Sequence, residues 1–486
     1  MRVSPTVMNW PIISSRSISA FLIIIASIFF PKCSAPAKQG AIVYKNNCAG
    51  CHGAELQGSV SPSLTGTLKH GDLREAILQT IRNGIPGTQM IKWSGAISDS
   101  DINAVADFIL EVRKSPNSIK SQEQPLHVQT KLYNLNIEKL ITHGLEGPWG
   151  IEFIDSNHAY ITGKNGDLYP IINGKLDSQK IKGLPKTYAT DLVGGMMDLA
   201  LDPDYKNNGW IYLAFSHNSK NSSDKDTPGM TMIVRGKVNG HQWTNQQTLF
   251  QVPDSLEVYH GTRWGCRFFF DKQGYLYFTI GDMQEAKQSG VDPQLPSKPQ
   301  GKIYRINSDG SIPKDNPLYG KKGVLQAIFC WGVRNVQGLA QHPVTGKIYF
   351  TDHGPRGGDE LNILKNGGNY GWPLATYGIN YDSTIISKDT AKPGTEQPIT
   401  YWTPSIAVCA AEFVQHSLFP KWENNLLVTA LKYEELRRLV IEDDKVLEQE
   451  ILLKGYGRVR DVKVGPDGAL YVLTNAPDAL LRITPL

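Results

Sequence analysis

The sequence predicts an all-β propeller of about six blades, preceded by a small all-α domain. Three observations predict this fold class. The chain has 486 residues, more than one hydrophobic core usually supports. Apolar residues follow helical spacing only before about residue 115. From about residue 138 onward one phrase recurs, namely an apolar strand, an Asp/Gly turn and a second strand rich in aromatic residues.

Residues 1–34 are predicted to be a signal peptide. Arg2 and Arg16 precede an apolar run from Phe21 to Phe30 that is too short for a confident membrane span. Cys33 fits a lipoprotein site poorly because small residues should come before it, so lipid anchoring and an uncleaved anchor are lesser alternatives. We expect a periplasmic or otherwise exported protein, and this segment is the one part of the sequence through which it could associate with a membrane.

Residues 35–115 are predicted to be a cytochrome c domain, because they contain Cys48-Ala49-Gly50-Cys51-His52. Thiols at Cys48 and Cys51 can bond to both vinyl groups of a haem, which places His52 under the iron as its proximal ligand. A zinc site would need a second closely spaced pair of cysteines, which the sequence lacks. Covalent haem c is therefore the expected cofactor, and it also agrees with export.

The rest of this domain supports the haem prediction. Ala41, Ile42 and Tyr44 predict a helix that runs into the cysteine pair. A second helix, capped by Ser98 or Ser100, is predicted from apolar residues at three- and four-residue spacing, namely Ile102, Val105, Ile109 and Val112. Met90, in a Pro-Gly loop, is the favoured second axial ligand, and His70 is the alternative. Pro62 and Leu64 resemble the Pro-x-Leu segment that packs on the haem edge in cytochromes c.

Residues 116–137 are polar and are predicted to be a linker, so the propeller would span 138–486. Copies of the strand phrase predict its blades, at Gly150–Phe153, Met197–Pro203, Arg267–Phe278, Gly338–Phe350 and Asp461–Val472, with a degenerate sixth copy around Asn424–Val428. Repeated strand pairs without helices between them favour a propeller, although an irregular β-sandwich is the alternative.

The composition is unremarkable, with 20% charged residues and a formal net charge of +4. No run of Lys and Arg is interleaved with aromatic residues, so nucleic acid is not an expected partner.

Several phrases in the propeller region resemble the soluble quinoprotein glucose dehydrogenase and aldose sugar dehydrogenase family. They occur in family order across 138–486, at Gly195–Asp204, Asp309–Pro317, Trp331–Leu339, His353–Pro355, Asp359–Asn362, Asn369–Pro373, Leu431–Lys432 and Arg458–Asp461. The resemblance implies a pyrroloquinoline quinone (PQQ) cofactor at the propeller axis, a calcium ion beneath it, and oxidation of a sugar at its anomeric carbon.

The resemblance also implies roles for individual residues. PQQ carries three carboxylates, so its pocket needs fixed cations, for which the candidates are Arg263, Arg334, Lys432, Arg458 and Arg460. Arg334 would act with Asn335 on the quinone oxygens. Arg458 and Arg460 are two residues apart on a strand and are expected to point to the same face. Backbone carbonyls of Gly354 and Pro355 would bind calcium. Asp359 would bind sugar hydroxyls and Trp402 would form an apolar wall.

The sequence departs from the family at the position of the catalytic base. The family has a His where this chain has Arg263, and an arginine that stays charged cannot accept a proton. His260 and His353 are the candidate substitutes, with Asp282 to orient the base. Val193 likewise stands where the family commonly has a Gln that contacts the substrate.

We therefore expect an exported dehydrogenase that oxidises an aldose or oligosaccharide. Its PQQ would pass electrons singly to the fused haem, and the haem would pass them to a respiratory acceptor. Two alternatives are a non-catalytic quinone- or carbohydrate-binding propeller joined to an electron carrier, and a calcium-dependent hydrolase of the lactonase type.

Overall fold

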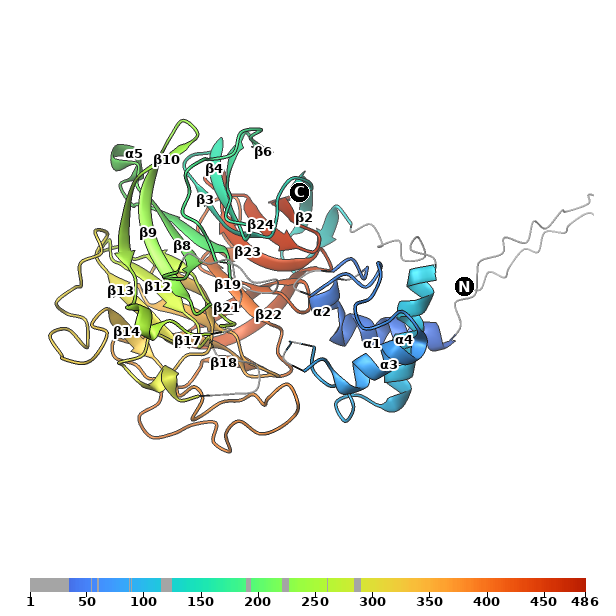
Figure 1. The fold of residues 1–486 in the computed structure, drawn as a ribbon. Helices are drawn as coiled ribbons and strands as arrows, with labels where there is room; N and C mark the ends of the chain where they lie inside the picture. The colour runs from blue at the N-terminus through green and yellow to red at the C-terminus, as the bar shows by residue number, and fades with distance from the viewer. Residues whose placement is uncertain are drawn as a thin grey trace, which may run out of the picture.

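The computed structural model describes residues 35–53, 55–58, 61–86, 88, 90–114, 125–188, 194–220, 227–259, 261–283 and 290–486. It contains a helical domain and a propeller of six β-sheets, which confirms the predicted fold class (Figure 1). The predicted signal segment, with Cys33, lies outside the described residues. Within the described ranges, every helix is too short or too polar to cross a membrane.

The helical domain consists of α1 (Ala35–Asn47), α2 (Ala49–His52), α3 (Arg74–Asn83) and α4 (Asp99–Lys114). The apolar face predicted for α4 is buried, and Ser98 caps this helix by accepting the Asp101 N–H at 3.1 Å. Helices α1 and α4 cross at Gly40, where an added Cβ would lie 2.1 Å from the Ala104 carbonyl oxygen. Glycine is therefore required for this close approach. Helix α3 was not predicted.

Each of the first five blades is a four-stranded antiparallel sheet built from consecutive strands. The first two blades contain β3 (Pro148–Phe153), β4 (His158–Gly163), β5 (Leu168–Ile172) and β6 (Lys175–Leu176), then β7 (Met196–Leu201), β8 (Ile211–His217), β9 (Met230–Asn239) and β10 (Gln242–Phe250). The third and fourth contain β11 (Phe268–Phe270), β12 (Leu276–Ile280), β13 (Lys302–Ile306) and β14 (Ile328–Trp331), then β15 (Val336–Gln341), β16 (Ile348–Asp352), β17 (Asp359–Ile363) and β18 (Thr400–Trp402). The fifth contains β19 (Val408–Phe413), β20 (Leu426–Ala430), β21 (Glu435–Glu442) and β22 (Lys445–Lys454).

The sixth blade closes the ring with strands from both ends of the propeller. Strands β23 (Arg458–Val464), β24 (Leu470–Asn475) and β25 (Ala479–Pro485) are joined by β2 (Asn134–Ile141) and β1 (His127–Gln129). The register pairs Asn136 of β2 with Thr484 of β25. The segment 116–137 predicted as a linker therefore contains all of β1 and the start of β2.

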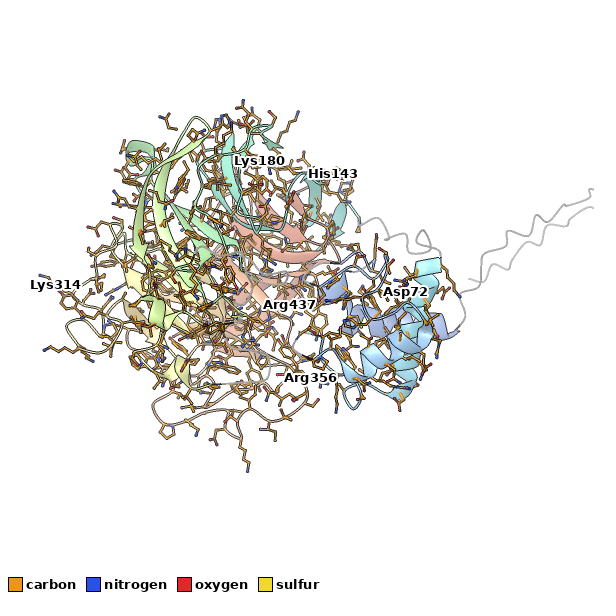
Figure 2. All side chains as sticks on the ribbon, in the orientation of Figure 1. Asp72, His143, Lys180, Lys314, Arg356 and Arg437 are labelled. Atoms are coloured by element: carbon orange, nitrogen blue, oxygen red, sulfur yellow. The ribbon has the colours of Figure 1, made fainter. Side chains whose placement is uncertain are left out.

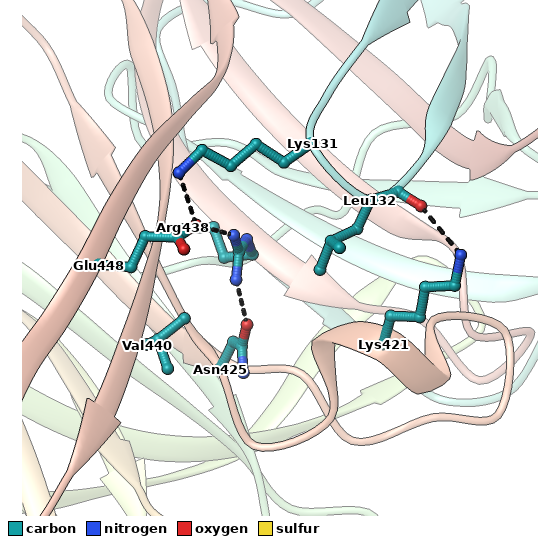
Figure 3. Close-up of a pocket in the computed structure, with 7 residues that line it drawn as sticks. All are labelled: Lys131, Leu132, Lys421, Asn425, Arg438, Val440 and Glu448. Atoms are coloured by element: carbon teal, nitrogen blue, oxygen red, sulfur yellow. Dashed lines mark hydrogen bonds and ion pairs between the residues drawn. The ribbon is translucent and has the colours of Figure 1, made fainter.

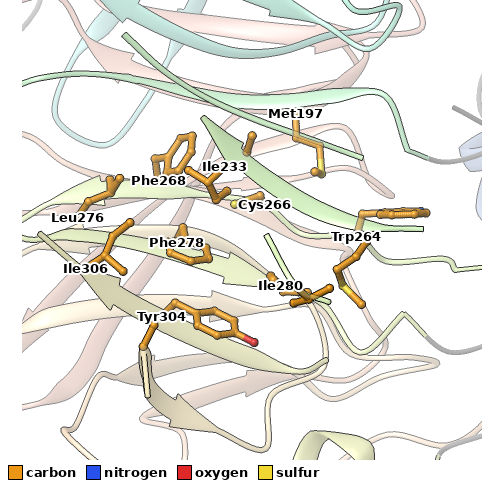
Figure 4. Packing of buried hydrophobic residues seen from close by; sticks show 14 of the residues in the cluster. Met197, Ile233, Trp264, Cys266, Phe268, Leu276, Phe278, Ile280, Tyr304 and Ile306 are labelled. Atoms are coloured by element: carbon orange, nitrogen blue, oxygen red, sulfur yellow. The ribbon is translucent and has the colours of Figure 1, made fainter. Parts of the chain in front are cut away.

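Apolar side chains fill the space between neighbouring blades. Figure 4 shows one such cluster, in which Met197, Phe268 and Phe278 from different strands pack together. Phe278 stacks on Tyr304 with ring centroids 4.9 Å apart. Alternating large apolar residues on these short strands form continuous layers of this kind around the propeller.

Charged residues hold the innermost strands together. Strands β3, β7, β11, β15, β19 and β23 contact one another in a closed ring around the axis. Inside it, Arg267 Nη1 lies 3.1 Å from both Asp198 Oδ1 and Asp461 Oδ1, and all three side chains are buried. Three different blades thus meet in one ionic cluster, which the sequence did not reveal.

Candidate active site and haem site

The haem motif lies on the short helix α2 and the residues that flank it. Cys48 and Cys51 are free thiols one helical turn apart. His52 Nδ1 lies 2.9 Å from the Pro62 carbonyl oxygen, which can only accept a hydrogen bond. The proton therefore sits on Nδ1, and Nε2 is left free to bind an iron atom, as in most metal sites with a histidine ligand.

Met90 is placed near this motif and His70 is not. Met90 packs, half-buried, on the apolar cluster that also contacts Cys48 and Leu64, whereas His70 is exposed. The described residues thus provide two thiols, an oriented imidazole, a thioether and an apolar surface. This donor set fits a c-type haem.

Four arginines surround His353 in the propeller. His353 follows β16 and is buried, and its pKa is far below the ordinary value because of burial and then the positive charges of Arg334, Arg458, Arg460 and Arg263. These residues come from the third, fourth and sixth blades. The structure therefore brings together the cationic residues that were predicted from separate phrases.

Asp352 fixes the arginine at the floor of this pocket. Its carboxylate accepts the backbone N–H groups of Arg334 at 2.9 Å and Asn335 at 2.6 Å. Arg334 Nη1 in turn donates to the carbonyl oxygens of His353 at 2.6 Å and Gly354 at 2.9 Å. The guanidinium is thus oriented by protein groups before any ligand binds.

Three of the four arginines of the pocket lack a partner of opposite charge among the described residues. No carboxylate in that part of the chain lies within ion-pair distance of Arg334, Arg458 or Arg460. Among the buried atoms without a hydrogen-bond partner in these ranges, three belong to the pocket, namely Asn335 Oδ1, His353 Nδ1 and Arg458 Nε. Buried cations and orphaned polar atoms are costly unless a ligand satisfies them. A multiply anionic cofactor with carbonyl and carboxylate oxygens, such as PQQ, fits this pocket.

Arg458 and Arg460 diverge, unlike the prediction that both point to one face. Arg458 Nη1 donates to the carbonyl oxygen of Gly50 in the haem motif. Arg460 Nη1 donates to Gln337 Oε1 at 3.0 Å, and its guanidinium lies over the Trp149 ring at 4.2 Å. The ladder of β23 shifts register between Val459 and Asp461, and this bulge breaks the two-residue alternation.

Arg263, at the position of the family base, forms an ion pair with Asp282. Arg263 Nε lies 2.6 Å from Asp282 Oδ1, and Asp282 Oδ2 accepts the indole N–H of Trp372 at 2.9 Å. Asp282 therefore orients an arginine, and its predicted role of orienting a base stays a prediction. His260, the other candidate base, lies outside the described residues, as does Val193.

Comparison with known proteins places both domains. A family model described as glucose/sorbosone dehydrogenase matches residues 145–482. The chain belongs to this family. A model of subunit III of the cbb3-type cytochrome c oxidase matches residues 35–109. The protein is therefore a sugar dehydrogenase-type oxidoreductase with a cytochrome c domain fused to its N-terminal side.

Individual relatives agree with this assignment. Aldose sugar dehydrogenase YliI of Escherichia coli (strain K12) is 36% identical over 358 residues, covering 72% of this chain and 93% of that protein. The crystal structure of the soluble E. coli aldose sugar dehydrogenase in its apo-form matches this structure with a TM-score of 0.67 and 36% sequence identity. The match covers 72% of this chain and 100% of that one. The helical domain is 36% identical over 84 residues to the cbb3-type oxidase subunit CcoP of Azospirillum brasilense, of which the match spans 28%.

The turn predicted to bind calcium is braced by protein groups. Asp359 is fully buried and accepts from the backbone N–H of Gly354 at 2.8 Å, the Ser405 hydroxyl at 2.8 Å and the Val408 N–H at 2.9 Å. It therefore holds the turn in place and is not free to bind sugar hydroxyls, as had been predicted. Arg356, next to Pro355, lies on the side of the propeller nearest the helical domain, and Lys314 lies at the far end (Figure 2).

The described residues of this turn do not make a calcium site by themselves. Calcium prefers about six to eight oxygen ligands, several of them anionic. Gly354 and Pro355 offer backbone oxygens only, and the Gly354 oxygen already accepts a hydrogen bond from Arg334. No group of three His, Cys, Asp or Glu side chains in the described ranges has the arrangement of a metal site. We therefore assign no chemical step to calcium.

The two remaining predicted residues are Trp402 and Lys432. Trp402 is on β18, the outermost strand of its blade, where it is buried in a core cluster and donates its indole N–H to Gln449 at 2.9 Å. This packing role does not support the predicted substrate wall. Lys432 places its ammonium 5.2 Å from the Tyr433 ring centroid, and burial lowers its pKa while the charge of Asp359 opposes that shift.

Residues from the long loop between β17 and β18 complete the pocket wall. Besides the indole of Trp372, which bonds Asp282, the Tyr381 hydroxyl lies 3.4 Å from Arg334 Nη2. The sequence phrase around Trp372 was noted but no role was assigned to it. In the sequence, Trp372 and Tyr381 could have been suspected only because both are aromatic and follow the matched Asp359–Asn362 phrase.

A separate cleft of about 260 Å³ lies on the outside of the fifth blade (Figure 3). Its cations are engaged with protein groups, since Lys131 pairs with Glu448 at 3.2 Å and Arg438 pairs with Glu450 at 2.8 Å. Because these charges are already paired within the protein, we assign the cleft no role in the reaction.

Proposed function

We infer that the protein is an exported PQQ-dependent dehydrogenase that oxidises the anomeric carbon of an aldose or oligosaccharide. Its own covalently bound haem c receives the electrons and delivers them to a respiratory acceptor. One observation carries this proposal. The pocket that has four arginines and three orphaned polar atoms is hydrogen-bonded, through Arg458, to the backbone of the haem motif.

Each residue of the pocket has a task in this reaction. When bound, PQQ supplies a two-electron acceptor for the hydride that leaves the anomeric carbon. Arg334 and Asn335 are fixed by Asp352 so that they can hold the quinone oxygens, and Arg460 and Arg458 supply charge for the carboxylates. Preorganised donors of this kind stabilise charge that develops during the reaction.

His353 is the base that the geometry favours. The sugar hydroxyl must lose a proton as the hydride leaves, and Arg263 cannot take it because its guanidinium stays charged and is paired with Asp282. His353 has a buried Nδ1 with no partner among the described residues. An unprotonated imidazole nitrogen in this pocket can accept the proton.

The helical domain provides the exit for electrons. His52 is oriented by the Pro62 carbonyl, and Met90 packs on the apolar cluster of the same domain, which supports these two residues as the ones that would hold the haem iron. Haem attachment through thioethers takes place outside the cytoplasm, which supports export of the protein as proposed from residues 1–34.

The test is substrate-dependent haem reduction. Purified haem-containing protein would be titrated with PQQ, and the absorbance of ferrous haem followed as aldoses, oligosaccharides and alcohols are added. We expect reduction with at least one sugar and none without PQQ. Binding of PQQ with no haem reduction by any sugar would favour the non-catalytic alternative, and lactone cleavage without PQQ would favour the hydrolase.

A further inference from the structure

Arg458 is a propeller residue that contacts the helical domain. It begins β23, and its Nη1 donates to the carbonyl oxygen of Gly50, which lies between the two haem-binding cysteines. A Cβ at Gly50 would lie only 3.4 Å from that nitrogen. The contact joins residues that are 408 positions apart in the chain.

A second contact between the domains comes from the same edge of the propeller. Close to it, the Tyr456 hydroxyl donates to the carbonyl oxygen of Pro125, where the described chain enters the propeller. The charges of Lys45 on α1 and of Arg458 both attract Glu434, in the turn between β20 and β21. Figure 1 shows α2 against this side of the propeller, next to β22. The helical domain is therefore seated over the rim that carries Arg458.

The rest of the Arg458 side chain faces the cationic pocket. Its Nε is buried without a hydrogen-bond partner in the described ranges. Burial and the charge of Arg460 lower its pKa, so the guanidinium is held in an environment that an anion would improve. The Nη1 atom of Arg458 is thus bonded to the haem motif, while its Nε atom could donate a hydrogen bond to the cofactor.

We propose that Arg458 couples the two redox centres, by docking the haem motif on the rim of the quinone pocket and by forming the electron route from the quinone through the Gly50 carbonyl to the haem. This inference rests on the proposed function and adds the route to it. The sugar loses two electrons and two protons in all. Each electron converts one ferric haem to ferrous haem, an external one-electron haem or copper protein reoxidises the haem between the two transfers, and both protons leave to solvent.

Two variants test the proposal. Arg458→Gln removes the charge and the fork of donors, and Lys45→Glu places a like charge opposite Glu434 without touching the pocket. Lys69→Glu is the matched control, since Lys69 is exposed on the same domain and makes no described hydrogen bond or ion pair to the propeller. Amide hydrogen exchange of the segment 48–53, measured in ferric protein without PQQ, reports only whether the haem motif is docked on the propeller. The rate of haem reduction by sugar, measured by stopped flow, reports on electron transfer from the pocket to the haem.

We expect faster exchange at 48–53 in both test variants and not in the control. Haem reduction should slow roughly tenfold or more in Lys45→Glu, because a negative charge near Glu434 repels it and weakens docking; a tenfold change corresponds to about 1.4 kcal/mol. Oxidation of sugar with an artificial dye should be unchanged in that variant. The proposal would be overturned if Lys45→Glu and Lys69→Glu had the same rates of hydrogen exchange and haem reduction. It would also be overturned if Arg458→Gln exchanged faster at 48–53 and still reduced its haem at the wild-type rate. If no sugar reduces the wild-type haem, the proposed function fails, while hydrogen exchange still reports whether Arg458 docks the domain.

Discussion

Arg263 and His353 lie in one cluster of charges, but only His353 carries a nitrogen lone pair that can accept a proton. The guanidinium of Arg263 is held by Asp282, and the His353 imidazole is kept neutral by burial and by four neighbouring cations. The position that the family uses for a base has thus become part of the cationic wall. The expected proton acceptor is instead His353.

We expect His353→Gln to lower kcat/KM for sugar oxidation by roughly 100- to 10,000-fold, the usual contribution of a general base. Glutamine keeps a polar side chain of similar size but cannot accept a proton. PQQ affinity, measured by titration of tryptophan fluorescence, should stay near that of the wild type. His143→Gln, an exposed histidine, is the control and should have no effect. Normal turnover in the His353 variant would mean that another residue is the base.

Met90 is expected to set the potential of the haem. A thioether opposite histidine raises the potential of the iron, so Met90→Ala should lower it in a potentiometric titration. Sugar oxidation with an artificial dye should continue, because Met90 belongs to the helical domain. The same substitution at the exposed His70 should leave the potential unchanged. A shift with His70→Ala and none with Met90→Ala would exchange their roles.

At the scale of single elements, the crossing of α1 and α4 depends on Gly40. A methyl group at this position would lie 2.1 Å from the Ala104 carbonyl oxygen, which is backbone and cannot rotate away. We expect Gly40→Ala to lower the free energy of unfolding of the haem domain by roughly 1–3 kcal/mol, as overpacking usually does. Thermal unfolding followed by haem absorbance would measure this.

Gly66 provides the comparison for this substitution. An added Cβ there meets no atom within 4 Å, so Gly66→Ala should change stability by less than about 0.5 kcal/mol. Similar losses at both positions would show that the helix crossing does not limit the stability of the domain.

Elements formed by nearby residues were predictable from the sequence. The haem motif, the cap at Ser98 and the apolar face of α4 are all read within a few turns of helix, and each blade repeats a local hairpin. Contacts between distant segments were not predictable. Trp402 was expected from the family resemblance to form an apolar wall for the substrate, yet β18 carries it to the outside of the blade.

The same reasoning explains the mixed outcome for the pocket. Matched phrases brought Arg334, His353 and Arg460 together correctly, because they lie just before β15, just after β16 and within β23, and the closed ring of inner strands brings these segments to one pocket. The direction of Arg458 depends on a bulge in β23 and on a docked second domain, neither of which leaves a local pattern.

For the whole molecule, the ionic cluster at the axis is expected to hold the blades together. Arg267→Met would leave the buried carboxylates of Asp198 and Asp461 without their counter-charge. Breaking a buried ion pair from one side costs about 3–5 kcal/mol, and we expect a loss of this size in denaturant unfolding followed by tryptophan fluorescence.

The control for this prediction is an ion pair at the surface. Lys365 pairs with Glu396 at 2.6 Å, and its side chain is 58% exposed, so Lys365→Met should cost about 0–1 kcal/mol. Equal costs for the two substitutions would contradict a special role for the axial cluster.

The closure of the sixth blade also determines where the haem domain is attached. The chain passes from that domain into β1 and β2, the outer strands of the sheet whose inner strand, β23, begins at Arg458. The cytochrome c domain is therefore joined to the blade that carries Arg458, and its local concentration beside the propeller is in the millimolar range, of the order typical for short linkers. Dilution of the protein cannot separate the two domains, and every propeller has its own cytochrome c domain at a fixed ratio of one to one.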